Sequence, residues 1–141
     1  KSERARVREA LGIPALGKMV PRQEVRKSPR VPVRLDFSYW LLEGKVVSAD
    51  AARGVIRDIG YNGVLAELER PLPRHAELKL AFELPALGYR ASDIYARIVA
   101  SREQNGRNLA GMEFTSLADE ASAKVRLFVQ MLLQGEFRQV D

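Results

Sequence analysis

The sequence predicts a mainly β fold, an antiparallel barrel or sandwich of six or seven short strands followed by one C-terminal helix. Two observations lead to this prediction. From Val31 onward, apolar residues alternate with polar ones in short segments, and this period of two is typical of half-buried strands. Helical spacing of apolar residues occurs near the C-terminus and not between the strands, where a parallel sheet would need its crossover helices.

The first strand is expected in "VPVRLDFSYW", where Val33, Leu35, Phe37 and Tyr39 share one face. The other strand candidates, in chain order, are "LLEGKVV", "RGVIRDIG", "GVLAELE", "AELKLAFELP", "IYARIVASRE" and "NLAGMEFT". Asn-Gly pairs at 62–63 and 105–106 stand between apolar runs. They predict tight hairpins, since both residue types tolerate a positive φ.

A helix is expected over residues 117–134, with Ser116 as its N-cap and Asp119 and Glu120 in its first turn. Gly135 is a natural stop. The apolar stripe of this helix comprises Val125, Phe128, Val129, Leu132 and Leu133. An exposed stripe of that size favours aggregation, so we expect the helix to cover an open end of the barrel. The alternative is that it packs against a partner.

Positive charge is concentrated at the N-terminus of a chain whose formal net charge is +5. Residues 1–34 hold ten of the 23 lysines and arginines but three of the 18 acidic residues. A basic arm on a nearly neutral body indicates an anionic partner, such as a nucleotide, nucleic acid, acidic protein or lipid headgroup. We interpret residues 1–21 as a linker or short helix and residues 22–141 as one domain.

The composition argues against an enzyme. The chain has no cysteine and one histidine, His75, which we expect in an exposed loop. The sequence shows no nucleophile with a matching base, no phosphate-cradling glycine loop and no metal-ligand cluster. We therefore expect no catalysis, no cofactor and no metal. No apolar run is long enough to cross a membrane, and the absence of cysteine suits a cytoplasmic protein.

Two short motifs carry the functional signal. Arg26 and Arg30 are four residues apart in "RKSPRVPV", where prolines exclude a continuous helix, so they are expected on an extended loop. Some 28 residues after Arg30 comes "DIGYNG", Asp58–Gly63, at a predicted strand turn. Arginine's planar fork suits phosphate oxygens and the O6 and N7 atoms of guanine. A carboxylate such as that of Asp58 accepts hydrogen bonds from guanine N–H groups.

This arrangement resembles the PilZ domain family, which binds the bacterial second messenger cyclic di-GMP. The family's marks are an RxxxR loop before the first strand and a [D/N]xSxxG motif at a strand turn. The resemblance covers roughly residues 22–134 and implies a β-barrel. Arg26 and Arg30 match the loop arginines, Asp58 the acidic position and Gly63 the final glycine. Gly60 stands where the family has serine.

The resemblance implies cyclic di-GMP as ligand, with Arg26, Arg30, Asp58, Gly60 and Gly63 at the site. Gly60 lacks a hydroxyl and so one hydrogen bond worth a net of about 1 kcal/mol, less than the about 1.5–3 kcal/mol of a bond to a charged group. Three further residues are candidate contacts: Arg22, Arg57 and Tyr61. Arg22 and Arg34 also lie at four-residue offsets and offer other registers of the arginine motif.

Two functions from different classes follow. The first is a receptor whose N-terminal arm is ordered on cyclic di-GMP and whose interaction with a protein partner then changes. The alternative is a degenerate domain of the same fold that contacts proteins without binding the nucleotide. Nucleic-acid binding is disfavoured, because the predicted barrel lacks a face on which aromatic and basic residues interleave.

Overall fold

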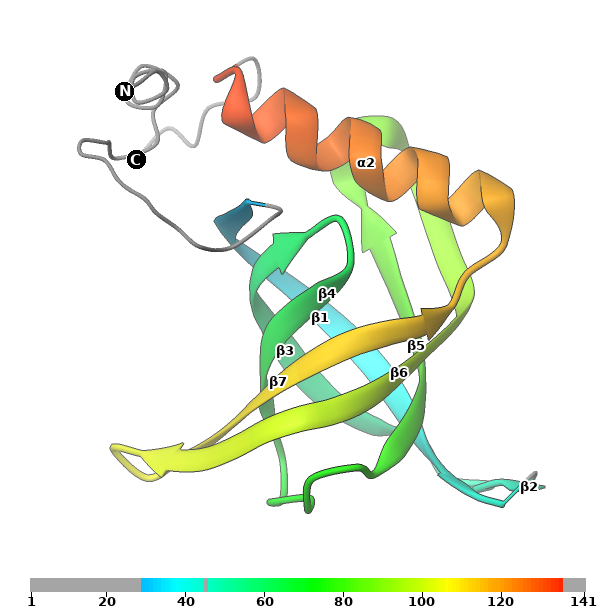
Figure 1. Ribbon diagram of the computed structural model, residues 1–141, viewed down its shortest axis with the longest axis vertical. Helices are drawn as coiled ribbons and strands as arrows, with labels where there is room; N and C mark the ends of the chain where they lie inside the picture. The colour runs from blue at the N-terminus through cyan, green and yellow to red at the C-terminus, as the bar shows by residue number, and fades with distance from the viewer. Residues whose placement is uncertain (1–28, 45, 136–141) are drawn as a thin grey trace.

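The computed structural model describes residues 29–44 and 46–135, which form one β-barrel with a helix across its end (Figure 1). The predicted arm, with Arg22, Arg26 and the segment 1–21, lies outside the described residues. The strands are β1 Arg30–Glu43, β2 Val46–Val47, β3 Ala52–Gly60, β4 Gly63–Leu68, β5 Glu77–Leu84, β6 Tyr89–Gln104 and β7 Arg107–Ser116. A short 3-10 turn, η1 Pro85–Leu87, precedes β6, and the helix α2 spans Asp119–Leu133. The predicted mainly β fold with a C-terminal helix is confirmed.

Strand β1 closes the barrel. The strands lie in the order β2-β1-β3-β4-β7-β6-β5, and β1 also pairs with β5, so six strands form a ring and β2 extends one end of β1. Every pairing is antiparallel. Phe37 is paired on both sides, with Gly54 of β3 and with Phe82 of β5. The predicted second strand in "LLEGKVV" is mostly a continuation of β1, because the chain stays paired through Glu43.

The inward residues of the strands form a single core. Leu35, Phe37 and Tyr39 are buried as the alternation predicts, and the Phe37 and Tyr39 rings stack with centroids 5.5 Å apart. The largest fully buried side chains come from β3 to β7 and α2: Phe82, Ile56, Ile59, Leu78, Leu80, Leu84, Ile94, Ile98, Met112, Val64 and Val125. Burial of apolar surface is the main stabilising contribution to such a fold.

The two Asn-Gly hairpins form for different physical reasons. At the β6–β7 turn, Asn105 and Gly106 have φ of 54° and 78°, as the hairpin prediction requires. At the β3–β4 turn, neither Asn62 nor Gly63 is among the described residues with positive φ, so the predicted reason is wrong there. Gly63 is required instead because a Cβ would overlap the Met112 carbonyl oxygen of β7.

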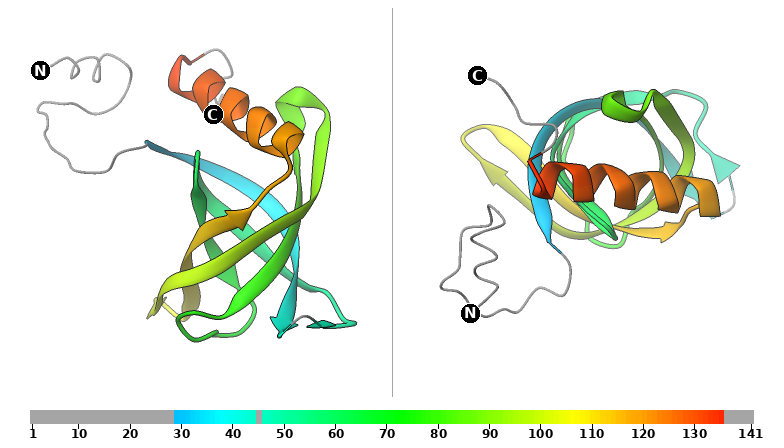
Figure 2. Two further views of the ribbon diagram at one scale, coloured as in Figure 1. Left: turned by 45° about the vertical axis from the view of Figure 1, so that its right-hand side comes forward. Right: turned by 90° about the horizontal axis from the view of Figure 1, so that it is seen from above.

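Helix α2 covers the end of the barrel. Viewed from above, it lies across the ring of strands (Figure 2), and its buried residues Ala121, Val125, Phe128 and Val129 pack into the core. The Gly135 stop is confirmed, because Gly135 has a φ of 77° and its N–H donates to the Leu132 carbonyl at 3.1 Å.

The predicted N-cap of the helix is wrong. Ser116 belongs to β7, where it pairs with Tyr95, and its backbone is therefore committed to the sheet. Ala118 occupies the N-cap position and makes no side-chain capping hydrogen bond. The acidic residues Asp119 and Glu120 do lie in the first turn, where they favourably oppose the positive end of the helix dipole.

We predict that Phe128→Ala lowers the free energy of unfolding by about 3–5 kcal/mol, since it removes a ring that is 2% exposed beneath α2. Leu127→Ala is the matched control on the same helix, because Leu127 is 43% exposed and should change stability by no more than about 0.5 kcal/mol. Urea unfolding of both variants measures the difference. Equal losses of unfolding free energy in the two variants would show that α2 does not close the end of the barrel through the face that carries Phe128.

Candidate ligand-binding site

An irregularity in β3 gives the site its shape. Ile56 pairs with Ala66 of β4, but Asp58 pairs with the next residue, Leu65, so β3 carries one extra residue at Arg57. This β-bulge lets Arg57 and Asp58 stay outside the core while Ile56 and Ile59 are both fully buried. In a regular strand, residues 56 and 59 would face opposite sides. The bulge therefore presents two consecutive charged side chains outside the barrel.

Arg30 and Asp58, one residue from each sequence motif, meet at this position. β1 and β3 are neighbours here, with Arg30 opposite Gly60 and Pro32 opposite Asp58. Arg30 Nη1 lies 3.5 Å from Asp58 Oδ1, and the two side chains are 30% and 27% exposed. The strand pairing thus joins residues that are 28 positions apart in the sequence.

The ion pair leaves hydrogen-bonding capacity on Asp58. Its Oδ1 atom is buried and accepts no hydrogen bond from the described residues, even though Arg30 lies within ion-pair distance. Buried polar atoms in folded proteins nearly always have a hydrogen-bond partner, and each exception calls for a physical reason. An acceptor oxygen beside a guanidinium suits a ligand that offers an N–H donor.

Gly60, the departure from the family serine, packs against the loop that leads into β1. Its φ is not positive, so the backbone conformation itself would accept another residue. However, a Cβ at this position would lie 2.7 Å from the Pro29 carbonyl oxygen and 3.3 Å from Arg30 Cγ. A serine here requires Pro29 to shift. The glycine is therefore also favoured by packing. The missing serine hydroxyl, which the sequence makes evident, does not reveal this role.

Arg57, predicted as a further ligand contact, forms an ion pair that sequence analysis missed. Glu67 of β4 accepts hydrogen bonds on Oε2 from Arg57 and on Oε1 from Arg107, the latter at 2.9 Å. The hydrogen bond from Arg107 is the main reason that the pKa of Glu67 is lowered, and the bond from Arg57 adds to it. Alternation places Glu67 on the outer face, but no spacing rule connects it to Arg107, 40 positions away.

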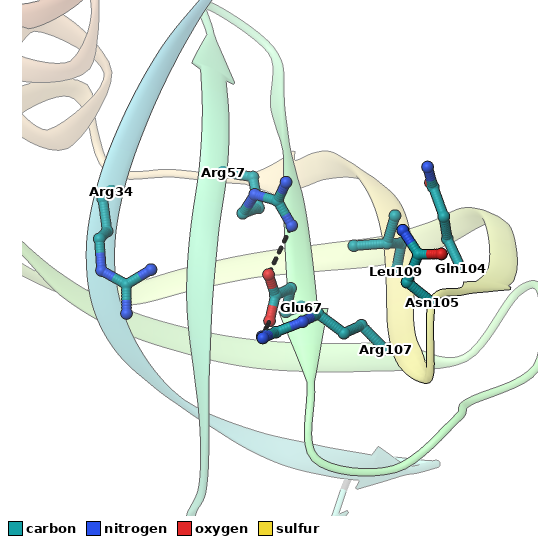
Figure 3. Close-up of a pocket in the computed structure, with 7 residues that line it drawn as sticks. All are labelled: Arg34, Arg57, Glu67, Gln104, Asn105, Arg107 and Leu109. Carbon is teal, nitrogen blue, oxygen red and sulfur yellow. Dashed lines mark hydrogen bonds and ion pairs between the residues drawn. The ribbon is translucent and has the colours of Figure 1, made fainter.

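These three residues line an open pocket together with Arg34, Gln104, Asn105 and Leu109 (Figure 3). Its volume is about 390 Å³. Neither Arg30 nor Asp58 lines it, so the outer face of the barrel carries two separate groups of charged residues. Arg34, a possible alternative register of the arginine motif, belongs to the second group.

Tyr61, another predicted contact, lies beneath the C-terminal helix. The Arg126 guanidinium of α2 stands over the Tyr61 ring, 4.5 Å from its centroid, which is a cation–π geometry. Tyr61 is half-buried and packs against the core. It therefore connects the "DIGYNG" turn to α2.

Within the described part of the chain, no three or more His, Cys, Asp or Glu side chains are grouped so as to hold a metal ion. His75 lies exposed in the loop before β5, as expected. Among the described residues, no helix has the length and apolar character needed to cross a membrane.

We predict that Glu67→Gln weakens the acid sensitivity of folding. Because the folded pKa of Glu67 is lowered, its ion pairs stabilise the protein fully above the unfolded carboxyl pKa of about 4.3. This contribution is lost as the pH falls through the folded pKa. The free energy of unfolding of the variant should therefore fall less between neutral pH and pH about 3 than that of the unmodified chain.

Denaturant unfolding across this pH range measures the effect. Glu113→Gln is the control, since it removes an exposed ion pair with Arg97 that is worth about 0–1 kcal/mol. Parallel pH profiles for the Glu67 variant and the unmodified chain would contradict the assignment.

Comparison with known proteins agrees with this architecture. The PilZ domain of YcgR from Escherichia coli, solved with c-di-GMP, superposes with a TM-score of 0.61 at 14% identity, covering 82% of this chain and 95% of that one. MotI/DgrA, the Bacillus subtilis inhibitor of motility, superposes with a TM-score of 0.65 at 16% identity, covering 90% of this chain. MrkH of K. pneumonia, in complex with c-di-GMP, superposes with a TM-score of 0.64 at 17% identity, covering 82% of this chain.

The chain spans 59% of the length of the MotI/DgrA structure and 56% of the MrkH structure. No curated protein matches the sequence significantly. At these identities the structural likenesses establish the fold alone. The family model for the PilZ domain, however, matches residues 24–131, most of the chain, and this chain therefore belongs to the PilZ domain family.

Proposed function

We propose that this chain is a cytoplasmic, non-enzymatic receptor domain for cyclic di-GMP that passes ligand binding on to a protein partner. The observation that carries the proposal is the contact between Arg30 and Asp58. Two motifs that the family uses for the nucleotide predict these residues, and the fold brings them within 3.5 Å. Solved relatives in the same family, YcgR and MrkH, are described with c-di-GMP.

The chemistry of the pair suits one half of the nucleotide. Arg30 offers a planar fork of donors to phosphate oxygens or to guanine O6 and N7. Asp58 Oδ1 has no hydrogen-bond partner among the described residues, and it can accept from the N–H groups on the Watson–Crick edge of guanine once the groups that bury it move aside. Before binding, the two side chains partly neutralise each other, so a ligand with both an anionic and a donor group can interact with both. Arg26, the other arginine of the RxxxR motif, would supply a second fork.

In this proposal, Tyr61 couples the ligand site to the surface that the partner recognises. The "DIGYNG" turn carries Asp58, Gly60 and Tyr61, and Arg126 of α2 stands over the Tyr61 ring. A ligand that moves this turn therefore changes the support of α2. In the proposal, ordering of the RxxxR arm and a shift of α2 together alter the surface that the partner recognises.

The alternative is a PilZ-type interaction domain that does not bind the nucleotide. The observation in its favour is the close packing of Gly60 on Pro29, at the position where the family has a serine side chain. If Pro29 cannot move, the nucleotide has less room near Asp58. Direct binding measurements separate the two functions.

We predict that cyclic di-GMP binds the full chain and that Arg30→Ala lowers its affinity by about tenfold or more, because it removes hydrogen bonds to a charged group. Asp58→Asn should also weaken binding, since it replaces one acceptor oxygen by a donor. Isothermal titration calorimetry measures both effects. Arg90→Ala serves as the control, because this arginine lies on β6 and lines a different hollow.

GTP serves as the ligand control. No heat with cyclic di-GMP on a chain that remains folded by circular dichroism would favour the non-binding alternative. Equal affinity for GTP would contradict a site built for the cyclic dinucleotide.

We predict that Gly60→Ser destabilises the domain by about 1–3 kcal/mol, since its Cβ meets the Pro29 carbonyl. Gly111→Ser is the matched control, because a Cβ at Gly111 makes only ordinary contacts at 3.8 Å and beyond. The new hydroxyl offers a hydrogen bond worth about 1 kcal/mol, but the displacement of Pro29 that its Cβ requires offsets this gain, so cyclic di-GMP affinity should not exceed that of the unmodified chain. A serine variant of unchanged stability and tighter binding would show that the loop moves freely away from β3.

A further inference from the structure

The pocket of Arg34, Arg57 and Arg107 lies on the outer face of the barrel and is separate from the PilZ motif residues. Its lining comes from β1, β3, β4 and the β6–β7 hairpin. In Figure 3 the guanidinium groups of Arg57 and Arg107 meet at Glu67, and Arg34 lies to one side of them on β1. At about 390 Å³ it has room for a small anion with part of a larger molecule attached. Neither Arg30 nor Asp58 lines it.

The charges in this pocket do not balance. Glu67 is its one acidic lining residue, and both of its carboxylate oxygens are already occupied, by Arg57 and Arg107. Arg34 has no carboxylate within 4.0 Å among the described residues. Three arginines against one glutamate leave an excess of two positive charges. If the network only stabilised the fold, the ion pairs of Glu67 with Arg57 and Arg107 would be sufficient, and Arg34 would add no further ion pair.

Two of these arginines, Arg34 and Arg57, lie at β-bulges. β1 has an irregular register between Pro32 and Leu35, which includes Arg34, and the bulge of β3 lies at Arg57. Bulges redirect side chains and are frequent beside functional sites. Glu67 then holds Arg57 and Arg107 in place, as a preorganised anion site requires.

We propose that Arg34, Arg57 and Arg107 form a second anion site, which binds a phosphate-bearing small molecule independently of the Arg30–Asp58 site. An excess of two positive charges matches a dianionic phosphate group. Several guanidinium forks can share the oxygens of one tetrahedral phosphate. The side-chain amides of Gln104 and Asn105 line the same pocket and suit the polar groups of the molecule that carries the phosphate.

The test is a titration of the full chain with pyrophosphate. Binding is detected by calorimetry and by changes in the NMR signals of the arginine Nε–H groups. Saturable binding that shifts side-chain signals of the three pocket arginines is expected. Arg34→Gln should weaken it about tenfold or more. Arg34 forms no ion pair with any of the described residues, so the melting temperature of this variant should match that of the unmodified chain. Arg107→Gln should weaken pyrophosphate binding as well.

Arg53→Gln is the matched control, with the same change of charge as Arg34→Gln at a residue of β3, the strand of Arg57, that does not line the pocket. It should leave pyrophosphate affinity within about twofold. An equal loss in Arg53→Gln would overturn the proposal in favour of general charge attraction, and so would the absence of saturable binding.

Arg30→Ala separates this inference from the proposed function. It should leave pyrophosphate affinity unchanged while it weakens cyclic di-GMP, and Arg34→Gln should do the reverse. If either variant weakens both ligands equally, the two groups of residues form one site and the inference of an independent pocket is wrong. If cyclic di-GMP fails to bind while pyrophosphate binding follows the predicted pattern, the proposed function fails and the second anion site stands.

Discussion

The fold depends on the double pairing of β1. This strand is hydrogen-bonded to β3 along one edge and to β5 along the other, so the sheet closes into a ring. Closure removes the exposed edges that an open sheet would carry and encloses Phe37 and Tyr39 among the side chains of the other strands. It also fixes the first residues of β1 beside the end of β3. The position of Arg30 relative to Asp58 is set by the register of β1 against β3 at this end of the strand.

The bulges in β1 and β3 reconcile this closed core with a charged outer face. Without the extra residue at Arg57, continued alternation would turn either Asp58 or Ile59 to the wrong side of the sheet. A carboxylate facing the core would be strongly destabilising, because a buried charge without compensation is costly. The bulge keeps the apolar residues inside and leaves Asp58 next to Arg30 and Arg57 next to Glu67. Two consecutive residues of β3 thereby take part in two different ion pairs on the outer face of the barrel.

Much of this architecture follows from patterns that are local in sequence. Alternation identifies β1 and its inward residues, and the resemblance to the PilZ family implies that Arg30 and Asp58 belong to one ligand site. What the patterns do not reveal depends on contacts between distant strands. Gly63 is needed because β7 approaches it, not for its φ, and Ser116 stays in the sheet because Tyr95 pairs with it. The pocket around Glu67 joins four separate segments, and only the register of the closed barrel brings Arg34 and Arg107 to it. The close contact of Gly60 with Pro29 likewise depends on the pairing of β1 with β3, so the motif alone does not predict it.

The position of α2 has a consequence for how this unit fits into larger proteins. The helix crosses the barrel so that its C-terminal end lies near the start of β1, at the same end of the molecule (Figures 1 and 2). A fold whose two ends emerge close together can be inserted into, or joined to, other domains with little disturbance of either. Because that end also holds Arg30, Gly60 and the Tyr61–Arg126 contact, polypeptide attached on either side is adjacent to the candidate nucleotide site. The candidate nucleotide site and both ends of the described fold thus lie at one end of the barrel.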